Sequence, residues 1–149
     1  MLDVEGVRRN LPHRYPFLMI DRVVEHGAER VVALKNVTVN EPFFQGHFPE
    51  PYGAVMPGAL IIEAMAQTAA FLALKGEGGP REGFLVGIDK ARFRRQVVPG
   101  DQLRLEAEKT REKRGLLQAR VEASVAGEMA ASATISLVLL EEGAERETE

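Results

Sequence analysis

The 149-residue sequence contains no cysteine, which excludes disulfide bonds and thiolate chemistry. Its three histidines, at positions 13, 26 and 47, lack the spacing of metal ligands, so we expect no metal site. The net charge is only −3, and the terminal segment 141–149, with five Glu and one Arg, carries −4 of it. The remaining chain is therefore close to neutral, and composition indicates neither nucleic-acid binding nor membrane binding.

The sequence also lacks internal repeats, low-complexity segments and an N-terminal apolar core typical of a signal peptide. We therefore expect a cytoplasmic protein. A chain of this length can bury a sizeable core as one domain. We expect that domain to span residues 1–140, and residues 141–149 to form an acidic, solvated tail.

The longest apolar run is "MPGALIIEAMAQTAAFLAL", residues 56–74, with Glu63 and Gln67 in its middle. It approaches the length of a membrane span, but both polar side chains would then lie in lipid. A helix in the protein's own core explains it better. Pro57 and Gly58 suit the start of this helix, where the first amides have no helical partner and can bind a negatively charged oxygen.

The segments around this helix predict strands, because apolar and polar residues alternate in several of them. Residues 17–25 and 30–39 predict a hairpin, and a further strand is expected within 84–98, ending at the turn that follows. Three more strands are expected at 103–112, 116–125 and 129–140. The pattern predicts an α+β fold in which an antiparallel sheet packs on the helix.

Two side chains stand out as candidates for acid–base chemistry. His47 lies in the aromatic loop "FFQGHFPEP", and Glu63 lies on the apolar helix, with Gln67 one turn later on the same face. Each is more often structural than catalytic when met alone. Together with the amides at the helix start, they form a candidate site with a base, an acid and hydrogen-bond donors.

The motifs "LPHRYPFLMIDRV", "GHFP", "MPGALIIEAMAQ" and "GIDKARFRRQVVPGDQL" resemble the (3R)-hydroxyacyl-acyl carrier protein dehydratases of FabZ type. The resemblance covers nearly the whole chain. It implies a hot-dog fold, in which a curved antiparallel sheet wraps a long central helix. It also implies conversion of a 3-hydroxyacyl thioester to a trans-2-enoyl thioester in type II fatty acid biosynthesis, without a cofactor.

The resemblance also assigns roles to residues. It implies that His47 is the base, that the Gly58 N–H binds the thioester oxygen, and that Glu63 protonates the leaving hydroxyl with Gln67 in support. Phe84 either lines the acyl tunnel or is a plain core residue. Isomerising relatives generally carry Asp at the position of Glu63, so we expect dehydration only.

The implied partners are an acyl carrier protein and further copies of the chain. The basic cluster Lys90, Arg92, Arg94 and Arg95 is a candidate docking site for the acidic carrier, and alternation along a strand would put its first three members on one face. The alternative is a solvated sheet face. The family forms homodimers, or hexamers of three dimers, in which His47 and Glu63 come from different chains.

One segment departs from the family pattern. Residues 50–55, "EPYGAV", are about two residues longer than usual and begin with Glu50 where the family usually has Gly. This affects the expected mouth of the site. His13, in "LPHRYPF", is interpreted as a structural loop residue, and the alternative is that it lines the site. Two other functions remain open, a hot-dog acyl thioesterase and a non-catalytic acyl-binding module.

Overall fold

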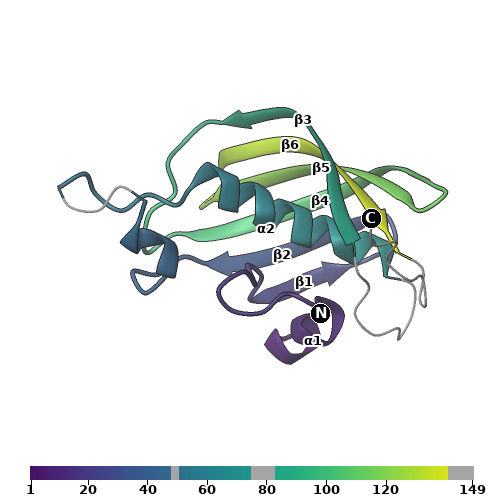
Figure 1. Ribbon diagram of the computed structural model, residues 1–149, viewed down its shortest axis with the longest axis horizontal. Helices are drawn as coiled ribbons and strands as arrows, with labels where there is room; N and C mark the ends of the chain where they lie inside the picture. The colour runs from purple at the N-terminus through teal and green to yellow at the C-terminus, as the bar shows by residue number, and fades with distance from the viewer. Residues whose placement is uncertain (48–50, 75–82, 141–149) are drawn as a thin grey trace, which may run out of the picture.

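The computed structural model describes residues 1–47, 51–74 and 83–140, and it contains one six-stranded antiparallel sheet and two α-helices (Figure 1). The strand order is β1-β2-β4-β5-β6-β3. The expected tail 141–149, Glu50 and the Gly-rich connection 75–82 lie outside the described residues. The elements are α1 (Val4–Asn10), β1 (Arg22–His26), β2 (Arg30–Asn36), the 3-10 helix η1 (Pro42–Gln45), α2 (Gly58–Ala70), the 3-10 helix η2 (Phe71–Ala73), β3 (Gly83–Phe93), β4 (Gln102–Lys113), β5 (Leu116–Val125) and β6 (Glu128–Leu139).

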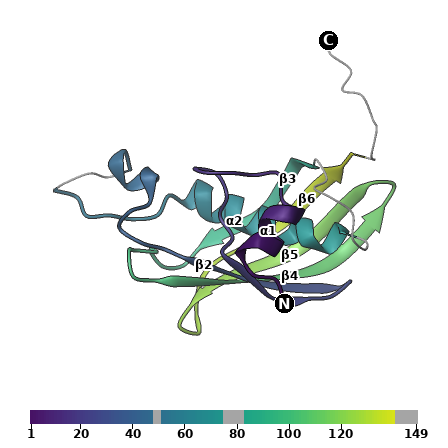
Figure 2. The same ribbon diagram turned by 90° about the horizontal axis from the view of Figure 1, so that it is seen from below.

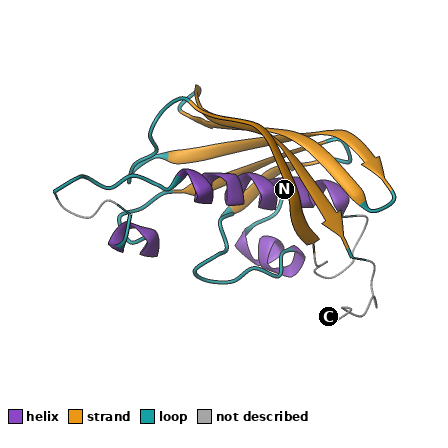
Figure 3. Ribbon diagram, turned by 45° about the horizontal axis from the view of Figure 1, so that its top comes forward, coloured by secondary structure: helices purple, strands orange, loops and turns teal. Residues whose placement is uncertain are grey.

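The central helix α2 begins at Gly58, directly after Pro57, as the sequence predicts. The carbonyl of Pro57 accepts hydrogen bonds from the amides of Leu60 and Ile61, which closes the first turn. The helix lies along the inner face of the curved sheet (Figures 1 and 3) and contacts β2 through β6. No helix among the described residues is long and apolar enough to cross a membrane.

The sheet confirms the expected alternation and pairing. Along β5 every second side chain is buried, so one face of the strand packs on α2 while the other face is turned to solvent. The β1–β2 hairpin also forms, but its first strand begins only at Arg22. The expected strand 17–25 was therefore wrong over residues 17–21. Within this segment the Phe17 carbonyl and the Met19 amide bond instead to Gln67 of α2, and pairing with β2 begins with the Asp21 amide, which donates to the carbonyl of Leu34.

The N-terminal segment covers a further part of α2, which the sequence did not predict (Figure 2). The helix α1 is capped by Asp3, whose carboxylate accepts a 2.9 Å hydrogen bond from the amide of Gly6. Val7, Leu11, Met19 and Ile20 are buried in the same core as α2. The helix is thus largely enclosed within one chain.

On the outer face of the sheet, charged side chains form a network across three strands. Glu106 of β4 lies 2.9 Å from Arg104 and 3.1 Å from Arg30 of β2, and Arg30 also lies 2.6 Å from Glu25. The hydrogen bond from Arg104, followed by that from Arg30, lowers the pKa of Glu106 below its ordinary value, although partial burial opposes this. The network therefore stabilises the ionised carboxylate.

This lowered pKa predicts a pH-dependent stability. A carboxyl group with a lower pKa in the folded state contributes stability above its unfolded pKa of about 4.3, and that contribution is lost as the pH falls through the folded value. Glu106→Gln should therefore lower the free energy of unfolding by up to about 1 kcal/mol near neutral pH, since the pair is partly exposed. Urea denaturation of both proteins should show the difference shrinking as the pH falls below the unfolded pKa, and a difference that stays constant with pH would contradict the assignment.

Candidate active site

Glu63 projects from the middle of α2 and is fixed by its neighbour one turn on. The side-chain amide of Gln67 donates a 2.8 Å hydrogen bond to Glu63 Oε1. Gln67 is 1% exposed, whereas the Glu63 side chain keeps 23% of its surface. The acid expected in the core thus stands at its edge, where a ligand can reach it.

Glu63 lines a pocket of about 170 Å³ between α2, β3, the end of β6 and the segment that follows α1. Most of the wall is apolar. Its lining comprises Leu11, Pro12, His13, Glu63, Ala66, Gln67, Ala70, Gly83, Phe84, Leu85, Leu137 and Leu139. Phe84, the expected tunnel residue, lies in this wall and is 48% exposed in the single chain, so it is not a plain core side chain.

His13 also lies in this pocket, beside the acid. Its Nε2 atom is 3.5 Å from Glu63 Oε1. The sequence favoured a structural loop role for this residue, because nothing in the motif shows that its side chain reaches a helix fifty residues away. The fold supplies that proximity.

His47 lies in a different part of the chain, just after η1. Its Nδ1 atom is 2.7 Å from the carbonyl oxygen of Val55. Because a carbonyl only accepts, Nδ1 carries the hydrogen of the neutral ring, and Nε2 carries the lone pair that a base requires. Val55 lies three residues before Gly58, so this hydrogen bond holds His47 near the start of α2.

The loop that carries His47 is fastened at its start by a buried ion pair. Lys35, at the end of β2, is 4% exposed, and its Nζ lies 3.1 Å from Glu41, the residue before η1. The amide of His47 then donates to the carbonyl of Phe43. A paired ammonium group at this depth is costly to disrupt, so the entry to the loop is firmly placed.

Gly58 is the first residue of α2 and lies under the ring of Phe93, the last residue of β3. A Cβ atom at Gly58 would stand 3.0 Å from that ring, so a side chain here would push Phe93 aside. The described structure thus forms two groups. His47 and Gly58 lie toward the start of α2, while Glu63, Gln67, His13 and Phe84 lie around its middle.

The expected docking residues do not behave as one cluster. A bulge between Asp89 and Arg92, with Lys90 at a φ of 52°, interrupts the alternation that was expected to align them. Lys90, Arg92 and Arg94 are exposed. Arg95 instead forms ion pairs with Asp101 at 3.3 Å and Glu128 at 3.1 Å, which tie neighbouring loops together.

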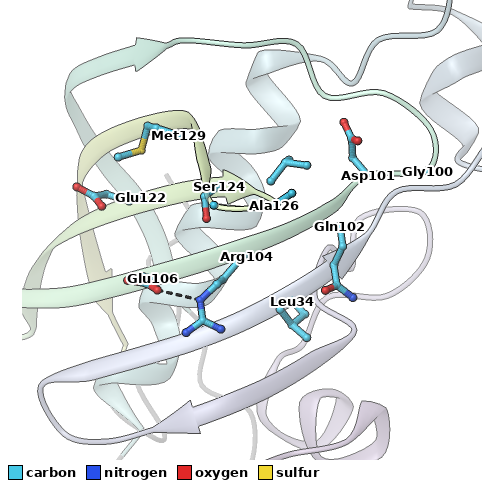
Figure 4. Close-up of a pocket in the computed structure, with 12 residues that line it drawn as sticks. Leu34, Gly100, Asp101, Gln102, Arg104, Glu106, Glu122, Ser124, Ala126 and Met129 are labelled. Carbon is cyan, nitrogen blue, oxygen red and sulfur yellow. Dashed lines mark hydrogen bonds and ion pairs between the residues drawn. The ribbon is translucent and has the colours of Figure 1, made fainter.

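A larger hollow of about 820 Å³ lies on the outer face of the sheet, lined by Arg104, Glu106, Glu122 and Ser124 among others (Figure 4). These side chains alternate with the buried ones, so they point away from α2. Its lining contains none of the site residues expected from the sequence. It does contain Asp101, the ion-pair partner of Arg95. Within the described residues, no three His, Asp or Glu side chains are arranged to hold a metal.

A family model for the FabA-like domain matches residues 11–134. The chain belongs to this family. Among its curated relatives, the FabZ 3-hydroxyacyl-[acyl-carrier-protein] dehydratase of Oceanobacillus iheyensis is 54% identical over 93% of this chain and 99% of its own length. Its counterpart in Alkalilimnicola ehrlichii is 53% identical over 93% of this chain and 92% of its own length. The resemblance stated from the motifs is confirmed.

Solved structures confirm the hot-dog fold. A chain of a dehydratase heterocomplex from Xenorhabdus doucetiae superposes with a TM-score of 0.79 over 91% of both chains, at 19% identity. A hypothetical thioesterase from Streptococcus pneumoniae, solved with coenzyme A, gives 0.60 over 80% of this chain and 84% of its own, at 14% identity. At such identities these likenesses show the fold alone, so the FabA-like family assignment rests on the sequence matches.

Proposed function

We propose that this chain dehydrates 3-hydroxyacyl-acyl carrier protein to trans-2-enoyl-acyl carrier protein in fatty acid biosynthesis. The observation that carries the proposal is Glu63 in the wall of a mostly apolar pocket, with one oxygen held by Gln67. Apolar walls suit an acyl chain, and a single acid suits transfer of one proton to a leaving hydroxyl. Curated FabZ relatives about half identical over most of the chain support this activity.

His47 is the proposed base. With the Nδ1 hydrogen bonded to Val55, Nε2 is the nitrogen that we propose accepts the proton from C2 of the substrate. Negative charge then develops on the thioester oxygen. The amide of Gly58, at the N-terminus of α2, is the proposed donor to that oxygen, where the helix dipole also favours negative charge.

Glu63 is the proposed acid. It donates its proton to the 3-hydroxyl as the bond from C3 to oxygen breaks, so water leaves and the C2–H electron pair becomes the C2–C3 double bond. The carboxylate and the His47 imidazolium formed in this way return to their starting states by proton transfer. No step draws on a cofactor, and the Glu at this position fits dehydration without isomerisation.

The two groups of site residues suggest that a complete site needs two chains. β3 lies at the edge of the sheet, and Phe84, Val86 and Phe93 are 48%, 55% and 51% exposed. A long, apolar edge strand is a template for pairing with another chain. Antiparallel pairing of two β3 strands near their middles would bring the Phe93 and Gly58 end of one chain against the Phe84 and Glu63 end of the other.

The carrier protein is the proposed source of the substrate. Lys90, Arg92 and Arg94 are exposed around Phe93, beside Gly58 and thus at the edge of the proposed shared site. Positive charge there would attract an acidic carrier and raise its rate of association. Arg95 is already held by Asp101 and Glu128, so we assign it to the loops instead.

The first functional prediction concerns the acid and the base. His47→Ala and Glu63→Gln should each lower turnover of a 3-hydroxyacyl thioester by about a hundredfold or more, on the usual contribution of positioned acid–base groups. The assay follows enoyl absorbance and free thiol in parallel, with circular dichroism as the folding control. Release of thiol without enoyl product would indicate a thioesterase, and substrate binding without either product would indicate a binding module.

The proposed pairing can be tested by mixing the two inactive variants. If each site takes His47 from one chain and Glu63 from the other, random exchange gives half mixed dimers, each with one intact site. Activity should then recover to about a quarter of the wild-type value, because the interface is symmetric. Exchange is verified with fluorescently labelled chains. Full exchange without any recovery would mean that both residues act within one chain.

The docking surface predicts a substrate-dependent effect. Arg92→Glu with Arg94→Glu should raise KM for the carrier-bound substrate about tenfold, and this KM should then depend much less on salt concentration. KM for a short thioester without the carrier should change little. The matched control is Arg111→Glu with Lys113→Glu. It makes the same change in charge on exposed residues at the C-terminal end of β4, outside the proposed docking surface. Equal losses on both substrates, or equal losses in the control, would remove the docking role.

A further inference from the structure

His13 is held over Glu63 by contacts on both sides of its loop. The Arg14 guanidinium donates to the carbonyls of Leu11, His13 and Arg8, at 2.8, 2.6 and 2.9 Å, which ties this side of the loop to α1. Farther along, the backbone at residues 17 and 19 is bound to the Gln67 amide. The backbone of His13 therefore lies between two anchored segments.

Both polar neighbours of Glu63 contact the same oxygen atom. Gln67 Nε2 lies 2.8 Å from Oε1, and His13 Nε2 lies 3.5 Å from it. The orientation of the Gln67 amide is unambiguous, because its oxygen accepts from the Met19 amide at 2.9 Å and its nitrogen donates to the Phe17 carbonyl at 2.7 Å. Gln67 is therefore a donor to Oε1.

The tautomer of His13 follows from its surroundings. Its Nδ1 is the one buried side-chain nitrogen or oxygen without a hydrogen-bond partner among the residues the structure describes. A hydrogen on Nδ1 would leave a buried donor unsatisfied and would turn a lone pair of Nε2 toward the carboxyl oxygen. A hydrogen on Nε2 instead lies on the ring nitrogen nearest Oε1, at an N···O distance of 3.5 Å. His13 is then placed to donate to this oxygen when the contact shortens.

We propose that His13 is a positioning residue for the catalytic acid, and that His13 and Gln67 together make Oε1 the accepting oxygen so that Oε2 carries the transferred proton. The inference rests on the proposed dehydration. In a neutral carboxylic acid one oxygen accepts while the other bears the hydrogen, and two donors at Oε1 select which is which.

The same two donors become stronger during the reaction. When the Oε2 proton passes to the leaving hydroxyl and the C3–O bond breaks, Glu63 gains a negative charge. Hydrogen bonds to a charged acceptor are shorter and stronger than those to a neutral one. The contact at 3.5 Å is therefore expected to shorten in the transition state. This lowers the barrier for loss of water and leaves the affinity for substrate unchanged.

The test separates departure of the hydroxyl from removal of the C2 proton. It compares a (3R)-3-hydroxybutyryl thioester with a 3-chlorobutyryl thioester of the same small thiol, because chloride leaves without a proton whereas hydroxide does not. His13→Leu should lower kcat for the hydroxyl substrate about tenfold with little change in KM, the loss expected for one hydrogen bond to a charged group. Elimination of chloride should fall by less than about twofold, since it does not need the acid.

Two further variants keep the test decisive if His13→Leu does not fold. Gln can place an N–H near the position of Nε2, whereas Asn reaches only the position of Nδ1. His13→Gln should therefore retain most of the hydroxyl activity, while His13→Asn should show the selective loss. His47→Ala is the reference for proton removal and should impair both substrates.

The outcomes are distinct from failure of the proposed function. Equal losses on both substrates in the His13 variants would show that His13 supports only the fold or the pocket. Unchanged rates on the hydroxyl substrate would show that it has no role in the acid step. Either result overturns the inference while dehydration by the wild-type chain stands, whereas a wild type that does not dehydrate the hydroxyl substrate refutes the proposed function itself.

Discussion

The amide of Gln67 is the contact on which most of the candidate site depends. It is almost fully buried on the central helix, so each of its polar atoms needs a partner. Its oxygen and nitrogen bind the backbone of Met19 and Phe17, and the same nitrogen holds Glu63. One side chain thus joins the N-terminal segment to α2 and at the same time orients the acid. The wall of the pocket and the direction of its carboxyl group have a common cause.

A second constraint is the separation of the site along β3. The loop with His47 is bound to the backbone just before Gly58, and Phe93 packs over that glycine at one end of the strand. Phe84 and Glu63 share the pocket near the other end. The exposed edge of β3 lies between these groups, so the strand that limits each chain is also the edge at which the proposed second chain would complete the site.

Much of the fold could be predicted from the sequence because its signals are local. The Pro–Gly start of α2, the apolar run behind it and the alternation in β4 and β5 each depend on neighbouring residues only. Segment 17–21 was misassigned because its apolar residues suit a strand equally well, and only the distant Gln67 decides that its backbone leaves the sheet. The short helix α1 was missed although Asp3 is a recognisable cap.

The site could be predicted less completely, for the same reason. His47, Gly58 and Glu63 were predicted as site residues because each lies in a distinctive motif, yet their division into two groups appears only when β3 is seen against α2. The basic cluster shows the limit of reasoning from alternation. A bulge at Lys90 breaks the register, and Arg95, beyond the end of β3, pairs with Asp101 and Glu128. The alternation of residues could reveal neither feature. His13 is the converse case, since a loop residue of modest promise lies beside the acid once the chain folds. Side chains whose role depends on a partner many residues away require the tertiary structure, and in this chain those are the residues that surround Glu63 and His47.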